Sequence, residues 1–138
     1  MILLDTSGLL AAIDSSQNQH AAAAAALREA GAPLLLSPFV LAELDYLLAA
    51  RVTSKAQRAL LDEVARGAYQ LEPFTANDVA SATVVIRRYS ELAIGLADAS
   101  IVVLAERYGV FDVLTLDRRH FHSLRRPEGQ PLRLHPSA

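Results

Sequence analysis

The feature that most limits the fold is a series of short apolar runs, such as Ile2 to Leu4 and Leu34 to Leu36, separated by longer stretches with apolar residues at helical spacing. Runs this short fit buried strands better than helices. Strands that alternate with helices favour a mostly parallel sheet with helices on both faces. We therefore predict an α/β fold, a three-layer sandwich around a central sheet of four or five strands, at residues 2–4, 34–36, 69–74, 113–116 and, as a short last strand, 132–134.

Capping residues mark where the helices begin and end. Ser37 before Pro38 is an N-cap followed by proline at the first helical position. Thr75 and Asp78 have the spacing of a capping box, with aspartate in place of the usual glutamate. We expect helices after residue 5 to about residue 13, at 20–30, from 38 onward, from 53 or 54 to 67, from 75 to 88 and at 97–108, and a loop at 127–131.

Length and composition exclude several classes of protein. The 138 residues show no linker or shift in composition, so we expect a single domain over residues 1–138. The lack of cysteine excludes disulfides, thiolate zinc sites and thiol nucleophiles. No apolar stretch approaches the roughly 20 residues of a membrane span, and the N-terminus lacks the basic region of a signal peptide, so a cytoplasmic protein is expected. The net charge of −2 argues against a surface that is basic all over.

Four carboxylates follow apolar runs and are the candidate catalytic and metal-ligating residues. They end the segments ILLD, PFVLAE, AIGLAD and VLTLD, and they are Asp5, Glu43, Asp98 and Asp117. Each lies where a strand ends or a following helix begins, and in an open parallel sheet such positions converge at the edge where ligands bind. Taken singly, each acid also has a structural explanation, as a helix cap, a partner of a helix dipole, a turn residue or an exposed helix residue.

Convergence of the four acids would require protons or a cation. At roughly 5 Å and an effective dielectric constant near 20, each pair of carboxylates repels by about 3 kcal/mol. Protonation of one or two acids would relieve the repulsion, but a set of hard oxygen ligands suits Mg²⁺ or Mn²⁺ better. Such an ion polarises a phosphoryl oxygen and activates water, so the candidate chemistry is that of phosphate esters.

Hydroxyl and basic side chains flank the acids. Ser7 follows Asp5 by two residues and Thr115 precedes Asp117 by two, so each hydroxyl either orients a carboxylate or serves as an ordinary cap or strand residue. The basic residues after Asp117 fit a clamp on RNA phosphates or a solvated turn. The RNA-binding candidates are Arg118 and Arg119, and Arg125 and Arg126 follow them closely in the sequence. Arg87 and Arg88 are candidates for further RNA contacts at the edge of the same acidic site.

The remaining patterns are less specific. None of the four histidines pairs with an acid at metal-ligand spacing, so surface or cap roles are expected, with His120 nearest to a candidate acid. The aromatic residues are scattered and form no platform for stacked bases. Leu44, Leu47 and Leu48 fit either a groove for a partner or the core.

Other functions fit parts of the pattern. A metal-dependent phosphatase would use Asp5 as its nucleophile, but serine stands two residues later, where a second aspartate would act as acid and base. A phospho-receiver domain needs a lysine near the acids, and Lys55, the only lysine, lies on a helix between strands. Dinucleotide binding lacks its glycine-rich turn. A non-catalytic interaction module remains an alternative, and metal-dependent RNA cleavage would distinguish a nuclease from it.

The ordered set of motifs resembles a known family. Asp5-Thr-Ser, Glu43 after the second strand, LADASIV around Asp98 and LTLDRRHF around Asp117 are similar in order and spacing to the PIN-domain nucleases, and among these to the VapC toxins of bacterial toxin–antitoxin pairs. The likeness extends from residue 2 to about residue 134. Each motif alone is weak, whereas the four in this order are specific.

The resemblance implies a PIN-like fold and a Mg²⁺- or Mn²⁺-dependent endoribonuclease that cleaves cellular RNA. The four acids correspond to the acidic quartet of the family, with Ser7 and Thr115 at its neighbouring polar positions. The fourth acid varies most in such families, so Asp117 is expected to assist rather than to be indispensable. The resemblance also implies a cognate VapB-like antitoxin whose tail blocks the active-site groove, a toxin homodimer, and a heterotetramer or larger complex with the antitoxin.

Overall fold

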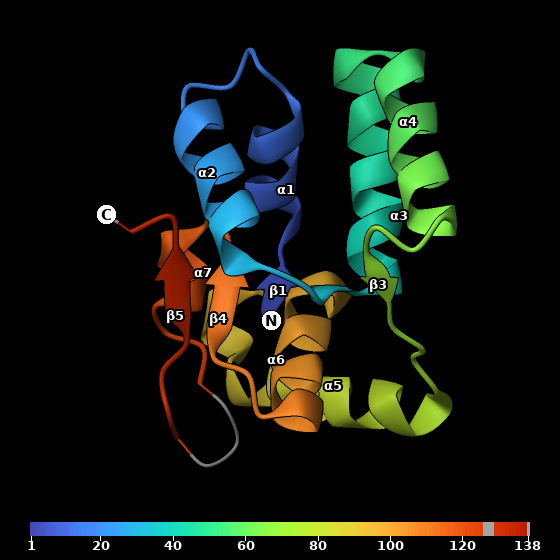
Figure 1. The fold of residues 1–138 in the computed structure, drawn as a ribbon. Helices are drawn as coiled ribbons and strands as arrows, with labels where there is room; N and C mark the ends of the chain where they lie inside the picture. Colours follow the sequence, from blue (N-terminus) through green and yellow to red (C-terminus); the bar gives the residue numbers. More distant parts are fainter. Residues whose placement is uncertain (126–128, 138) are drawn as a thin grey trace.

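Five parallel strands form one sheet in the computed structural model, which describes residues 1–125 and 129–137 (Figure 1). The strand order is β3-β2-β1-β4-β5. The strands are β1 (Ile2–Leu4), β2 (Leu34–Leu36), β3 (Gln70–Leu71), β4 (Asp112–Leu114) and β5 (Arg133–His135). The predicted α/β architecture with a parallel central sheet is confirmed.

Helices connect the strands and pack in pairs. They are α1 (Thr6–Ile13), α2 (His20–Ala30), α3 (Pro38–Leu47), α4 (Ser54–Ala65), α5 (Ala76–Arg88), α6 (Leu96–Tyr108) and α7 (Arg118–Phe121), with a π-helical segment η1 (Leu48–Val52) and a 3₁₀ turn η2 (Ser90–Leu92). In Figure 1 the α1–α2 and α3–α4 pairs stand at the top of the view, and α5 and α6 lie together at the bottom. No helix within the described ranges combines the length and apolarity needed to cross a bilayer.

Both predicted caps are present. The Ser37 hydroxyl accepts a hydrogen bond from the backbone N–H of Phe39 at the start of α3. Thr75 and Asp78 form a reciprocal capping box at the start of α5. These bonds satisfy N–H groups that have no partner inside their own helix. The two helices therefore begin where the sequence predicts.

Several element boundaries differ from the prediction. The third strand, Gln70–Leu71, is much shorter than residues 69–74, although the N–H of Glu72 after it still donates to the carbonyl of Leu36. The fourth strand occupies Asp112–Leu114 instead of 113–116, and the fifth begins one residue later than expected. The turn expected after Asp117 is the one-turn helix α7. Of the expected loop at 127–131, residues 127 and 128 lie outside the described residues.

The strand order places a topological switch point between β1 and β4. The chain proceeds from β1 outward to β2 and β3, then crosses to β4 and β5 on the other side of β1. Leu3 pairs with Val113 and Leu4 with Leu114, so β1 and β4 end side by side. In open parallel sheets the connections leave in opposite directions at such a point and open a crevice beyond the carboxyl ends of the strands. Residues that follow β1 and β4 are therefore brought together.

Helix α1 approaches the end of β4 unusually closely at Gly8. A Cβ atom at this position would lie 2.4 Å from the carbonyl oxygen of Leu114 and 2.8 Å from the backbone nitrogen of Thr115. Both contacts are with backbone, which cannot rotate away as a side chain would. Glycine is thus required here because only a hydrogen fits between the helix and the strand.

Substitution of Gly8 by alanine should destabilise the protein by at least about 2 kcal/mol, since the added methyl group forces α1 away from β4. Thermal unfolding should show a fall in melting temperature of roughly 5–10 °C. Gly95→Ala is the matched control, because a Cβ atom at Gly95 would meet nothing within 4 Å. Equal melting temperatures for the two variants would contradict the packing argument.

Candidate active site

The carboxylate of Asp5 is held at the switch point by two hydroxyl groups. Asp5 directly follows β1, and only 4% of its surface is exposed. Its Oδ2 accepts a hydrogen bond from Ser7 Oγ at 2.7 Å and another from Thr115 Oγ1 at 2.7 Å. Burial raises the pKa of Asp5, whereas the bonds from Thr115 and Ser7 partly oppose that rise. The carboxylate is thus fixed in orientation, and its pKa lies above the ordinary value.

Ser7 and Thr115 also hold the chain that leads to Asp117. The two hydroxyl oxygens lie 3.2 Å apart. Ser7 Oγ accepts from the N–H of Leu116 at 2.9 Å, and Thr115 Oγ1 accepts from the N–H of Asp117 at 2.9 Å. The structure therefore brings both predicted hydroxyls to the predicted acids and joins the start of α1 to the end of β4.

Asp98 lies in the first turn of α6 and is influenced by all three other candidate acids. Burial raises its pKa, and the negative charges of Asp5, Asp117 and Glu43 raise it further, to about 6, although His120 acts in the opposite direction. Only carboxylates that face a common region contribute in this way. The repulsion anticipated from the sequence is thus present around Asp98.

The raised pKa of Asp98 predicts a specific pH dependence of stability in the absence of divalent ions. The folded-state value of about 6 lies above the ordinary value of 3.8, so the folded protein binds this proton more tightly than the unfolded chain. The resulting stabilisation is fully present below pH 4 and is lost as pH rises through 6, by about 2–3 kcal/mol for a shift of this size. Urea unfolding in EDTA from pH 4 to 8 should show this loss in the wild type relative to Asp98→Asn. Parallel curves for the two proteins would refute it.

His120 lies between two of the acids, which sequence reasoning did not anticipate. Its Nδ1 is 3.0 Å from Asp117 Oδ2 and 3.7 Å from Asp98 Oδ2. The one-turn helix α7 causes this placement, because Asp117 accepts from the N–H of His120 as its N-cap and turns the imidazole back toward the site. His120 is the one positively chargeable group shown against these acids among the described residues.

Glu43 is exposed on α3, although the segment PFVLA before it is largely apolar. The buried face of the helix instead carries Val40, Leu44 and Leu48, all fully buried. Glu43 lies beside this face, and its negative charge contributes to the raised pKa of Asp98. The same burial excludes Leu44 and Leu48 from an open partner groove, because they belong to the core.

The oxygen ligands of the site suit a hard divalent ion. Asp5, Glu43, Asp98 and Asp117 provide carboxylates, and their mutual repulsion is the electrostatic condition that a cation relieves. Within residues 1–125 and 129–137, however, no three His, Asp or Glu side chains are arranged to hold one ion. Mg²⁺ takes only one or two carboxylates directly and retains several waters, so the donor set fits such an ion without a preformed cage.

The arginine candidates differ in how free they are. Arg118 donates to the backbone carbonyl of Pro136 and is half-buried, so it ties the C-terminal segment to α7. Arg119, beside it, is exposed, as are Arg87 and Arg88 in the last turn of α5. Arg125 donates to carbonyls of its own turn. Arg126 lies outside the described residues.

A fifth carboxylate at the same edge of the sheet is neutralised. Glu72 follows β3 and is 3% exposed. It accepts hydrogen bonds from Arg107 Nη1 at 3.1 Å, Tyr108 OH at 2.5 Å and Gln70 Nε2 at 2.8 Å. Glu72 also follows a strand directly, and sequence reasoning missed it because no apolar run precedes it. Because its charge is already compensated, Glu72 has a structural role.

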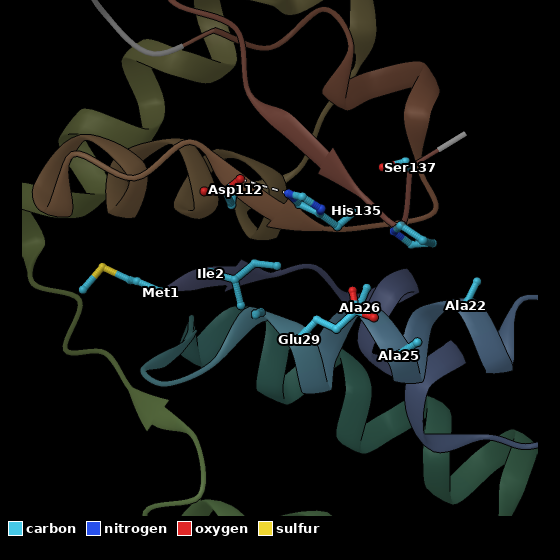
Figure 2. A pocket seen from close by; sticks show the side chains of 11 residues that line it. Met1, Ile2, Ala22, Ala25, Ala26, Glu29, Asp112, His135 and Ser137 are labelled. Atoms are coloured by element: carbon cyan, nitrogen blue, oxygen red, sulfur yellow. Dashed lines mark hydrogen bonds and ion pairs between the residues drawn. The ribbon is translucent and has the colours of Figure 1, made fainter.

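A pocket of about 470 Å³ lies away from the acids, between α2 and the sheet (Figure 2). Ile2, Ala26, Asp112 and His135 are among the residues that line it. Asp112 accepts from both Arg133 and His135, and the bond from Arg133 contributes most to lowering its pKa to about 2. None of the predicted site residues lines this pocket, so it is separate from the candidate site.

Comparison with known proteins agrees with the fold. Residues 2–127 match the PIN domain. Ribonuclease VapC26 of Mycobacterium tuberculosis (strain ATCC 25618 / H37Rv) is 44% identical over 124 residues, which are 90% of this chain and 92% of that protein. The crystal structure of Mycobacterium tuberculosis VapC20, a sarcin–ricin loop cleaving toxin, superposes with a TM-score of 0.79 at 22% identity, over 85% of this chain and 90% of that one. VapBC2 from Rickettsia felis, bound to a promoter DNA fragment, has a TM-score of 0.66 at 20% identity, over 97% and 98%.

Proposed function

Since the chain belongs to the PIN-domain family, we propose that it is a metal-dependent endoribonuclease and the toxin of a toxin–antitoxin pair. The observation that carries the proposal is the arrangement at the switch point. Ser7 and Thr115 hold the buried Asp5 by hydrogen bonds, and the charges of Asp5, Asp117 and Glu43 raise the pKa of Asp98. The 44% identity to a ribonuclease toxin over most of the chain supports RNA as the substrate.

The four acids would hold Mg²⁺ or Mn²⁺. When bound, such an ion polarises a phosphoryl oxygen and lowers the pKa of water for attack on phosphorus. The residues of the chain supply the geometry. Ser7 and Thr115 occupy Oδ2 of Asp5, and neither takes its Oδ1. Asp117 is oriented by the N–H of His120, which bonds its Oδ1 at 3.1 Å.

Basic groups are needed because an acidic pocket repels RNA. We assign the first phosphate contact to Arg119, which is exposed and follows Asp117 by two residues. Arg87 and Arg88 are proposed as more distant contacts. The guanidinium of Arg118 already donates to the carbonyl of Pro136, so we assign Arg118 a structural role beside the site instead of a phosphate contact.

The proposed partners follow from the relatives. A toxin of this kind would be held inactive in the cytoplasm by a VapB-like antitoxin, and VapBC2 from Rickettsia felis is an example of such a pair. We further propose that the toxin is a homodimer that forms a heterotetramer or larger complex with its antitoxin.

RNA cleavage tests the proposal directly. The purified protein is incubated with total RNA in Mg²⁺, in Mn²⁺ and in EDTA, beside Asp5→Asn and the control Asp62→Asn, whose carboxylate is exposed on α4. Wild type and Asp62→Asn should cleave RNA in either ion and not in EDTA, and Asp5→Asn should be inactive. Equal cleavage by Asp5→Asn, or cleavage in EDTA, would mean that the proposed site is not responsible.

A further inference from the structure

Two buried serine hydroxyls connect the helices that carry Glu43 and Asp98. Ser37 and Ser100 are 1% and 0% exposed, and their Oγ atoms lie 2.7 Å apart. Ser37 directly follows β2 and caps α3, which carries Glu43. Ser100 lies on α6, two residues after Asp98. The contact thus joins the start of α3 to α6.

The direction of each hydrogen bond in this group can be assigned from the partners. Ser100 Oγ lies 2.6 Å from the carbonyl of Ala97, which can only accept, so Ser100 donates to it. The proton between the two hydroxyls must then come from Ser37. Ser37 Oγ in turn accepts from the N–H of Phe39 at 3.2 Å. Each donor in this series of hydrogen bonds therefore has an acceptor, and only one assignment of donors and acceptors fits the partners.

The hydrogen bond between Ser37 and Ser100 is not needed to form either helix. Ser37 already accepts from Phe39 as the N-cap of α3, and Ser100 already donates to Ala97 within α6. The bond between them therefore contributes the relative placement of the helices. A fully satisfied buried polar contact specifies one arrangement, whereas apolar side chains at a helix contact tolerate several.

The geometry points to Ser37 and Ser100 as positioning residues that set the separation of Glu43 and Asp98 for a divalent ion. The inference rests on the proposed function, because it concerns the ion held by the four acids. Glu43 is six residues after Ser37, about 9 Å along the helix axis. A small change in the direction of α3 at its N-cap therefore displaces the exposed carboxylate of Glu43. Asp98, less than one turn from Ser100, moves with it directly.

Titration calorimetry with Mn²⁺ measures this role without relying on RNA cleavage. The proteins are wild type, Ser37→Ala, Ser100→Ala and the double variant. Each single variant should bind Mn²⁺ about 10-fold more weakly, as for loss of a group that orients a metal ligand. The double variant should also be about 10-fold weaker, instead of 100-fold, because the same bond is lost in all three. Leu60→Ala, buried on α4, controls for lost stability and should bind Mn²⁺ as the wild type does.

The possible results separate the inference from the function on which it rests. Wild-type affinity in the single variants, or an additive loss in the double variant, would overturn the positioning role and leave the nuclease proposal intact. Weakening by Leu60→Ala to the same degree would also overturn it, because stability alone would then explain the loss. A wild-type protein that neither binds Mn²⁺ nor cleaves RNA would overturn both.

Discussion

Asp98→Asn should lower RNA cleavage by a factor on the order of 10³ while making the metal-free protein more stable. The two effects have one cause. Asp98 is the carboxylate that the charges of Asp5, Asp117 and Glu43 act upon, and its pKa is raised to about 6. Asparagine keeps the shape of the side chain and removes the charge, so it relieves the repulsion and removes a metal ligand together.

The stability gain follows from the same pKa shift. In EDTA at pH 7.5 the ionised Asp98 costs the folded wild type about 2–3 kcal/mol at most, since the group is partly exposed. Asp98→Asn should therefore melt several degrees above the wild type in EDTA. In 10 mM Mg²⁺ the difference in melting temperature between the variant and the wild type should become smaller or change sign, because the ion stabilises only the protein that binds it.

Asp62→Asn provides the comparison, since its carboxylate is exposed on α4 and the change should alter neither cleavage nor melting by much. An Asp98→Asn protein that is inactive but less stable than the wild type in EDTA would show that Asp98 supports the fold. The proposal of a repulsive metal site would then lose its main electrostatic support.

Much of the site could be predicted because parallel strands end at one edge of a sheet. Asp5 follows β1 and Thr115 follows β4, and these strands are neighbours across the switch point. The hydrogen bond between their side chains, 110 residues apart in sequence, is a consequence of that order. The short apolar runs were therefore sufficient to indicate the fold class and to predict that Asp5 and Thr115 meet at one edge of the sheet.

Other features depended on contacts that no local pattern specifies. Glu72 follows a strand as Asp5 does, but Arg107 and Tyr108, from the end of α6, neutralise it. The difference between a structural acid and a site acid lies in its partners across the fold, which the run before it does not reveal. The contacts of Arg107 and Tyr108 with Glu72 distinguish the two.

His120 and Gly8 illustrate two further limits. His120 reaches the acids because α7 forms a single helical turn, too short to show a hydrophobic period. Gly8 is required by backbone atoms of β4 more than a hundred residues away, and its own neighbours resemble those of any glycine in the first turn of a helix. Both features arise from tertiary contact alone.

Thr115→Val should have the second largest effect, because it removes a hydroxyl that has three polar neighbours while preserving side-chain shape. Thr115 is fully buried. Its Oγ1 donates to Asp5 Oδ2 at 2.7 Å and accepts from the N–H of Asp117 at 2.9 Å. Valine would leave that N–H without its partner and free the Asp5 carboxylate to rotate. The expected cost is about 2 kcal/mol in unfolding free energy and about 10- to 100-fold in metal affinity.

Thr83→Val is the matched control. The hydroxyl of Thr83, on α5, donates to the carbonyl of Val79 within its own helix. Its loss should change stability by less than about 0.5 kcal/mol and leave cleavage at the wild-type rate. Urea unfolding and RNA cleavage over a range of Mg²⁺ concentrations separate the two contributions of Thr115. Recovery of cleavage by Thr115→Val at high Mg²⁺ would show that the hydroxyl acts through the ion. Wild-type cleavage at every Mg²⁺ concentration would show that Asp5 keeps its orientation through Ser7 alone.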